Sequence, residues 1–302
     1  MRRRTPRHGD RPHRARRHPG RRSAGRRTTS THLLTSSPTT RRHAITGSHT
    51  YSAQDTLSPD PEAGTLMFAR YAYAPNALGY CGPADATALR NGSARQIRAA
   101  AQHFTGAWPY LRVMSAMTGI ADPLDERLVE SYWHGGGIGA EIEPSAFLDR
   151  LLTILGPAAG HYWTHLTPQL ADEAAPNHAF HVFGVYPWSR LLDSPAASTA
   201  SSILDNCRIT PARVMSRDGA RVRLRSRRLV WNGRYLSLGP PSIRTVTIAL
   251  DGRSPIDPRC GDQVALHWGQ PAGPLTPAQV AEITISTLRQ LAVTNHRLHP
   301  DP

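Results

Sequence analysis

The sequence predicts an α+β fold. A mainly helical part covers residues 63–202, a small antiparallel β-barrel of the OB type covers 203–270, and a closing helix covers 275–298. Apolar residues of the first part recur at helical spacing between glycine and proline breaks. After the first part they alternate in short runs separated by turn dipeptides such as Asn232-Gly233, which is typical of a small barrel.

The helical part is expected to begin near Ala63 and to hold five helical stretches. They cover about 83–103 (split in two at Asn91-Gly92), 108–117, 122–134, 144–155 and 178–186. Pro123 and Pro144 each stand at a first helical position, where proline costs no hydrogen bond. A linker of small residues, 194–202, then leads to the barrel.

In the barrel, Cys207 is expected to open the first strand and His267 to close the last. Barrel closure tends to make first and last strands neighbours, so the thiol and the imidazole would meet at one rim. A thiolate with an imidazole is a soft, incomplete ligand set that can hold Fe(II). The alternative is a buried structural cysteine and a hydrogen-bonded histidine at a strand end. After the barrel, Pro277 is expected to open a helix with an apolar stripe that packs on the body.

The net charge of +14 lies mostly at the N-terminus. All 36 basic residues are arginine, and residues 1–62 hold 14 of them with four acids. This segment lacks apolar periodicity, so we expect it to be disordered. A gene start assigned too far upstream, with the true start near Met67, is our preferred interpretation over a functional arm. If the arm functions, it binds nucleic acid through arginine–phosphate contacts.

The three cysteines are too few and too scattered for a disulfide framework, which favours a reducing compartment. No run of apolar residues approaches the length of a membrane span. The sequence therefore predicts a cytoplasmic protein that does not enter a membrane.

Two stretches of the barrel resemble the small hydrogenase-assembly chaperones of the HypC/HupF type, which read C-x-x-x-P-G-(K/R)-V and G-D-x-V-x-(V/L)-H-x-G. The matching residues are Cys207, Pro211, Arg213 and Val214, then Gly261, Asp262, Val264, Leu266, His267 and Gly269. The resemblance covers about 65 residues. It departs from the family in that Ala212 replaces the glycine, the cysteine is internal rather than terminal, the intervening stretch is longer and Gln270-Pro271 replaces an apolar continuation.

In that family the cysteine and histidine carry an iron fragment with cyanide and carbon monoxide ligands toward a nickel–iron hydrogenase. The resemblance therefore implies iron as a transient cofactor held by Cys207 and His267, and a partner such as a hydrogenase large subunit or another maturation factor. The helical part is outside this resemblance. Its segment 68–83, F-A-R-Y-A-Y-A-P-N-A-L-G-Y-C-G-P, resembles an uncharacterised bacterial family.

A second group of candidate residues is Cys81 with His178 and His181. Cys81 directly precedes an expected helix N-terminus, where the macrodipole favours the thiolate, and the two histidines fall on adjacent turns of another helix. A cysteine–histidine nucleophile, with Asp85 or Asn177 orienting the imidazole, is one interpretation. A three-ligand metal site and plain helix packing are the others.

These observations predict a non-enzymatic accessory protein that acts in the assembly of a metalloenzyme and carries iron on Cys207 and His267. The alternative is a thiol-dependent hydrolase or transferase that uses Cys81 with His178 or His181.

Overall fold

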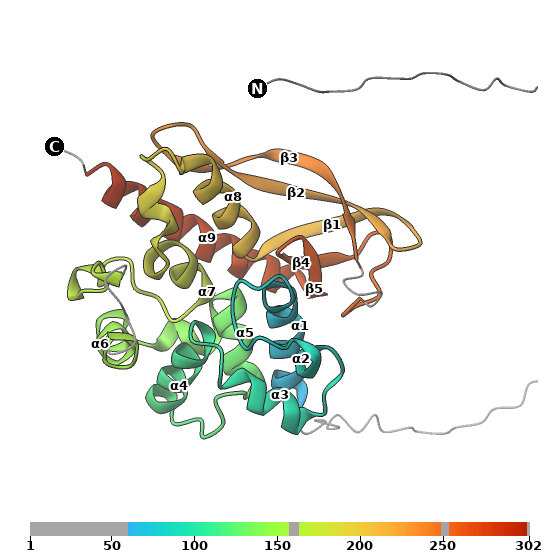
Figure 1. Ribbon diagram of the computed structural model, residues 1–302, viewed down its shortest axis with the longest axis horizontal. Helices are drawn as coiled ribbons and strands as arrows, with labels where there is room; N and C mark the ends of the chain where they lie inside the picture. Colours follow the sequence, from blue (N-terminus) through green and yellow to red (C-terminus); the bar gives the residue numbers. More distant parts are fainter. Residues whose placement is uncertain (1–59, 157–162, 249–253, 301–302) are drawn as a thin grey trace, which may run out of the picture. The chain divides into compact units, whose positions relative to one another are not determined.

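The computed structural model describes residues 60–156, 163–248 and 254–300. Of the expected N-terminal tail, only residues 60–62 fall within these ranges, so the expectation of disorder lies outside the described part. The described residues form helices, then a five-stranded antiparallel sheet, then a C-terminal helix, which confirms the α+β class (Figure 1).

The first helix, α1 (Ala63–Ala77), is not among the helices expected from the sequence. Eleven of its fifteen residues are buried, so it lacks the polar side on which a helical period becomes visible, and Pro75 lies inside it. The other helices before the sheet are α2 (Thr87–Asn91), α3 (Ala94–Ala101), α4 (Ala107–Thr118), α5 (Glu126–His134), α6 (Pro144–Leu155), α7 (His178–Phe180) and α8 (Ala197–Cys207).

Local capping explains where several helices begin. Ser93 and Gln96 form a capping box at α3, and the Glu143 side chain accepts hydrogen bonds from two backbone amides in the first turn of α6. The Asp125 side chain caps α5 by accepting from the Arg127 amide, so α5 begins at Glu126 rather than at the expected Pro123.

A second difference concerns the segment expected to be a linker, 194–202. Most of it belongs to α8, which forms although its residues are small and polar. Ala200, Leu204 and Cys207 of α8 are buried in one apolar cluster with Val182 and Phe183, so tertiary packing outweighs weak helix propensity.

The sheet is open, and the expected closed barrel is wrong. Its strands are β1 (Thr210–Asp218), β2 (Arg221–Trp231), β3 (Leu236–Thr247), β4 (Gln263–His267) and β5 (Gln270–Pro274), in the spatial order β3-β2-β1-β4-β5. All pairings are antiparallel, with β1 between β2 and β4. The edges are formed by β3 and β5, which do not pair with each other.

The last helix, α9 (Pro277–Leu298), begins at a capping box of Thr276 and Gln279 with Pro277 in its first turn, close to the expected start. It contacts α5 and α7 on one side and β1 and β3 on the other. The helix thereby joins the helical layer to the sheet, as Figure 1 shows.

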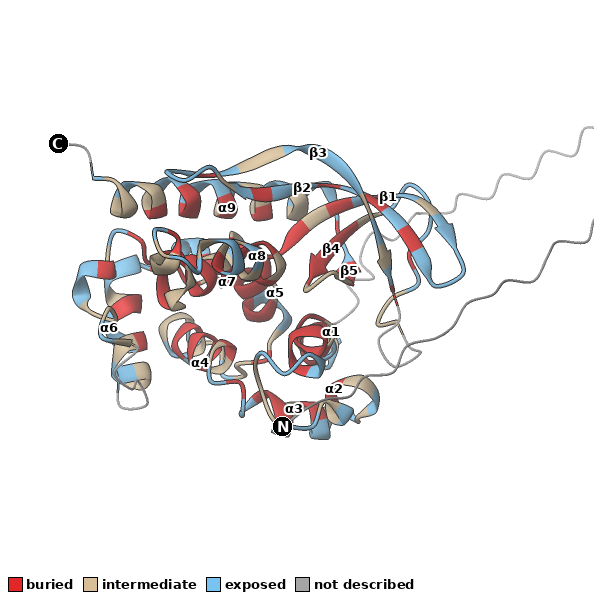
Figure 2. Cartoon of the chain, turned by 45° about the horizontal axis from the view of Figure 1, so that its top comes forward, coloured by how far each residue is buried: buried red, intermediate tan, exposed pale blue. Residues whose placement is uncertain are grey.

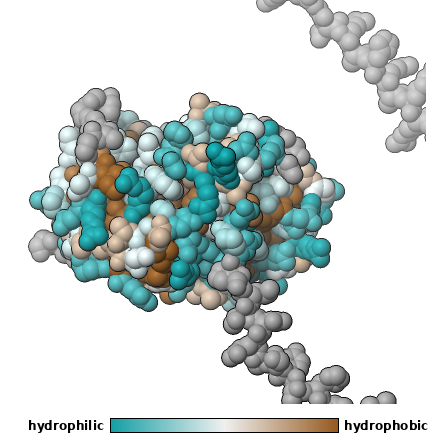
Figure 3. Space-filling model, turned by 90° about the horizontal axis from the view of Figure 1, so that it is seen from below, coloured by the Kyte–Doolittle hydropathy of each residue, from teal (hydrophilic) through white to brown (hydrophobic). Residues whose placement is uncertain are grey.

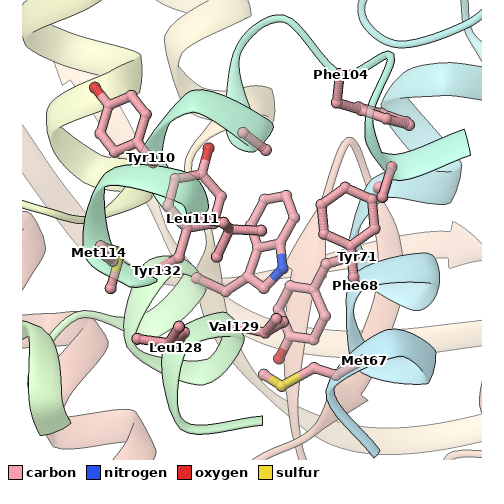
Figure 4. Close-up of a cluster of buried hydrophobic side chains, with 14 of the residues drawn as sticks. Met67, Phe68, Tyr71, Phe104, Tyr110, Leu111, Met114, Leu128, Val129 and Tyr132 are labelled. Carbon is pink, nitrogen blue, oxygen red and sulfur yellow. The ribbon is translucent and has the colours of Figure 1, made fainter. Parts of the chain in front are cut away.

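The main core lies between the helices α1, α4 and α5 and extends to the sheet through Ile209, Ala265 and Ala272. Figure 4 shows side chains of the three helices directed toward one another. Tyr71 and Trp133 stack within this core, with ring centroids 5.4 Å apart. In Figure 2 these helices are largely buried, whereas β3 is exposed or intermediate along most of its length.

On the face seen in Figure 3, hydrophobic residues show in separate patches among hydrophilic ones. Within the described ranges, no helix combines the length and the apolar character that crossing a membrane requires.

Candidate functional site

Cys207 is the last residue of α8, not the first residue of a strand as expected. β1 begins three residues later and pairs with β4, with Thr210 opposite Leu266. The Trp268 amide also donates to the Asn206 carbonyl oxygen at 2.7 Å. These contacts hold the end of α8 beside the end of β4, where His267 lies.

His178, at the start of α7, joins the other two residues. One ligand atom from each of His178, Cys207 and His267 lies within 4.8 Å of the other two, and all three residues are buried. The rings of His178 and His267 are 5.1 Å apart, and the Trp133 indole packs against both. This arrangement of one sulfur and two imidazole nitrogens can hold a metal ion.

Backbone hydrogen bonding determines the tautomer of His267. Its Nδ1 lies 2.7 Å from the Tyr71 carbonyl oxygen, so Nδ1 carries the proton and donates. The other nitrogen, Nε2, is buried with no hydrogen-bond partner among the described residues. A metal ligand with its second nitrogen bound to a carbonyl is the usual arrangement for histidine in metal sites. His267 therefore presents a free lone pair.

His178 uses both ring nitrogens in hydrogen bonds. Nε2 donates to the carbonyl oxygen of Cys207 at 2.9 Å, and Nδ1 accepts from the Tyr132 hydroxyl at 3.1 Å. To ligate a metal, the imidazole must give up one of these bonds. In this structure His178 thus holds the backbone of Cys207, and it can become a metal ligand only after it loses one of these two hydrogen bonds.

Burial sets the protonation of the group. It lowers the pKa of His267 to about 4 and that of His178 well below its usual value, so both imidazoles are neutral at pH 7. Burial raises the pKa of the Cys207 thiol, so this group is protonated at pH 7. Metal binding there must release the thiol proton, whereas the histidines need lose none.

The three residues line a pocket of about 200 Å³ whose wall is mostly aromatic. The Tyr80 and Trp268 rings stack on that wall with centroids 3.7 Å apart. Trp268 has φ +51°, a left-handed conformation that costs a non-glycine residue about 1–3 kcal/mol. This strain occurs directly after His267, where the chain turns from β4 into β5.

Cys81 and His181 line the same pocket, so the two groups of candidate residues are parts of one site. The basis for an activated Cys81 is wrong, however. α2 begins at Thr87, and Cys81 lies in a loop held by the Asn76 side chain, which donates to the Cys81 and Pro83 carbonyls. Burial raises the pKa of the Cys81 thiol to about 12, opposite to what a nucleophile needs.

His181 adds a further unpartnered imidazole. Its Nδ1 is buried without a hydrogen-bond partner within the described residues, and burial lowers its pKa to about 3. Asp85, one expected orienting residue, instead accepts from the Thr87 amide, and Asn177 caps α7. Neither is placed to orient a catalytic histidine by these bonds.

The sequence grouped His178 with Cys81 and His181, and its contact with Cys207 was not expected. Its contact with Cys207 spans 29 positions and depends on how α7 packs against α8, for which no local pattern exists.

Comparison with known proteins gives no functional name. No curated protein matches the chain, and no solved structure matches it either. One family model matches residues 60–301, which include both the helical part and the sheet. The chain therefore belongs to a family of unknown function, DUF6390.

Proposed function

We propose that this protein binds a transition-metal ion, iron(II) in the first place, through Cys207 and His267 with help from His178, and delivers it during the assembly of a metalloenzyme. The observation that carries the proposal is that ligand atoms of one buried thiol and two buried imidazoles lie within 4.8 Å of one another. The free Nε2 of His267 supports it, because an unpaired buried nitrogen is costly unless something binds it.

The donor set fits a carried metal better than a structural one. A structural zinc site has four protein ligands, whereas three leave at least one position for a ligand from outside. The pocket provides the space for such a ligand, and His178 must exchange a hydrogen bond for a metal bond, which lowers the net affinity. An incomplete, moderately tight site suits transfer to a client.

The resemblance to hydrogenase-assembly chaperones supports iron as the metal and a nickel–iron hydrogenase large subunit as the client. The alternative, a thiol hydrolase built on Cys81, is less well supported, since burial disfavours the thiolate of Cys81.

The test is anaerobic loading of the purified full-length protein with iron(II), followed by removal of free metal and measurement of bound iron. We expect close to one iron per chain, lost in Cys207→Ser and in His267→Gln. Cys260→Ser and His103→Gln are the matched controls, because Cys260 and His103 are exposed and lie outside the pocket. Equal iron in Cys207→Ser and Cys260→Ser would contradict the proposal.

Delivery is tested separately. The iron-loaded protein is incubated with the metal-free hydrogenase large subunit, and the iron content of the re-isolated subunit is measured. If the iron stays on the carrier, the hydrogenase large subunit is not its client, but the proposal of a metal site is unaffected. Zinc(II) loading in parallel shows whether the site prefers iron.

A further inference from the structure

The solvent-facing side of β2 carries a row of arginines. Along this strand buried residues such as Val222 and Leu224 alternate with exposed arginines, so one side of the sheet packs on the core and the other is basic. The arginines of the row are Arg221, Arg223, Arg225 and Arg227, with Arg213 on β1 directly opposite Arg225. We call these five residues the arginine face.

The basic charge of the folded part is concentrated here. Residues 210–247, from β1 to β3, hold nine arginines and a single acid, Asp218. The rest of residues 63–302 holds 13 arginines against 17 acids. Arginine is the only strongly basic residue type in this chain, so a single arginine does not indicate a binding site. The accumulation of arginines on one sheet does indicate one.

Most charges of the arginine face are not used within the described part of the fold. The exception is Arg227, whose guanidinium donates to the carbonyl oxygens of Leu238 and Gly239. Among the described residues, no carboxylate forms an ion pair with Arg213, Arg223 or Arg225, whereas nearby Arg217 pairs with Asp257. Arg213 and Arg225 are cross-strand neighbours, and like charges in that position are destabilising. Such a face is suited to an anion from outside.

Aromatic rings lie beyond the last arginine of the row, at the turn between β2 and β3. Tyr235 has 40% of its surface exposed, with the Arg234 guanidinium 5.1 Å from its ring centroid. The His299 ring lies edge-on to Tyr235 at 5.5 Å. An exposed ring beside a basic track is what stacking of a nucleic-acid base requires.

We propose that the arginine face binds single-stranded nucleic acid, with the phosphates along β2 and a base stacked on Tyr235. Alternate residues of a strand lie about 6.8 Å apart, which lets successive guanidiniums contact separate phosphates. A row of guanidiniums spaced along an extended strand suits the regularly spaced phosphates of a long polyanion better than a compact acidic protein. None of the arginine-face residues lines the metal pocket, so this proposal is independent of the proposed function.

The test uses full-length protein and fluorescence anisotropy with labelled single-stranded RNA and DNA of mixed sequence, about 20 nucleotides long, at about 50–200 mM salt. The triple variant R213Q/R223Q/R225Q is compared with R95Q/R112Q/R150Q, which removes three exposed arginines elsewhere. Each phosphate contact contributes about 0.7 to the salt slope of single-strand binding, so we expect the first triple to lose about 2 and the second to lose almost none.

The comparison within full-length protein separates the sheet from the N-terminal segment, which is the same in both triples. Tyr235→Ala should weaken binding at least about fivefold without changing the salt slope. Circular dichroism checks that each variant folds. If the triple variant does not fold, Arg223→Gln alone replaces it in the test, with an expected change of about 0.7 in the salt slope.

Equal effects of the two triples would show general charge attraction only and would overturn the proposal. So would a face that binds polyglutamate but no nucleic acid, which would identify an acidic protein as the partner. The RNA and DNA arms, with a duplex DNA of the same sequence, show which nucleic acid the face prefers.

Discussion

The Nδ1 of His267 lies 2.7 Å from the carbonyl oxygen of Tyr71, a contact across 196 positions of the chain. Because this bond fixes the proton on Nδ1, Nε2 is left with a lone pair and no partner among the described residues. A backbone carbonyl cannot be removed by mutation, so the orientation of His267 is built into the packing of α1 against β4.

His267→Gln removes a proposed metal ligand. Loss of a hydrogen bond that only supports a ligand lowers metal affinity about 10- to 100-fold, so this variant should lower it by more. The free energy of unfolding should stay about the same. Titration of iron(II) against a competing chelator measures the affinity. His178→Gln should cost less than His267→Gln, since His178 ligates only after giving up a bond to Cys207 or Tyr132. The reverse order of the two variants would show that His178 is the stronger ligand.

Metal binding should depend on pH through the thiol. Burial raises the pKa of Cys207 and lowers that of His267 to about 4, so between pH 5 and 8 only the thiol must lose a proton. The logarithm of the association constant should then rise by about 1 per pH unit. Chelator competition at several pH values measures the slope, and a slope near 2 would mean that a histidine also releases a proton.

Stability without metal should fall as the pH falls. His178, His181 and His267 all have lowered pKa values in the folded protein, so the unfolded chain binds more protons below about pH 6.5. Each histidine should remove up to about 1.4 kcal/mol per pH unit from the free energy of unfolding, until the pH reaches its folded value. Urea unfolding at pH 5 and 7 measures the loss, and His267→Gln should reduce it. A free energy that is constant over this range would show that the histidines are solvated.

The sequence predicted the parts of the fold that have strong local signals. The expected starts at Pro144 and Pro277 and the alternation of Val222 and Leu224 all correspond to observed elements. Glycine followed by proline is typical of a turn, but Gly239-Pro240 lies inside β3. β3 is an edge strand, where a proline without an amide proton breaks no sheet pairing, so local composition was misleading there.

The site was predicted in part. Strand adjacency placed Cys207 near His267, and the two do meet, although through the pairing of β1 with β4 in an open sheet and with Cys207 on a helix. The inclusion of His178 and the position of Cys81 in the same pocket follow from how helices and sheet pack together. Such long-range packing produces no local pattern or fixed residue spacing in the sequence, so it could not be predicted from the sequence.

The thiols should differ sharply in reactivity. Cys260 is exposed, whereas burial raises the pKa of Cys81 to about 12, so the Cys81 thiol is almost entirely protonated at pH 7. Brief alkylation with iodoacetamide and peptide mass spectrometry should modify Cys260 first and leave Cys81 and Cys207 largely unmodified. Fast modification of Cys81 would revive the hydrolase interpretation.

The end of α8 should depend on Asp205. One carboxylate oxygen accepts from the Arg208 guanidinium at 2.9 Å and from the Leu229 amide at 2.8 Å, and Arg208 is only 3% exposed. Asp205→Ala leaves that buried charge unpaired, so we expect a loss of about 3–5 kcal/mol in the free energy of unfolding.

The matched control is Asp257→Ala, which removes a carboxylate that is 74% exposed and pairs with Arg217. Water and salt screen an exposed pair, so this variant should unfold almost as the wild type does. Urea denaturation of both variants gives the comparison. Because Cys207 lies between Asp205 and Arg208, Asp205→Ala should also weaken metal binding under conditions in which the variant is still folded. Similar unfolding free energies for the two variants would mean that Arg208 reaches water, and the end of α8 would then not be held by this ion pair.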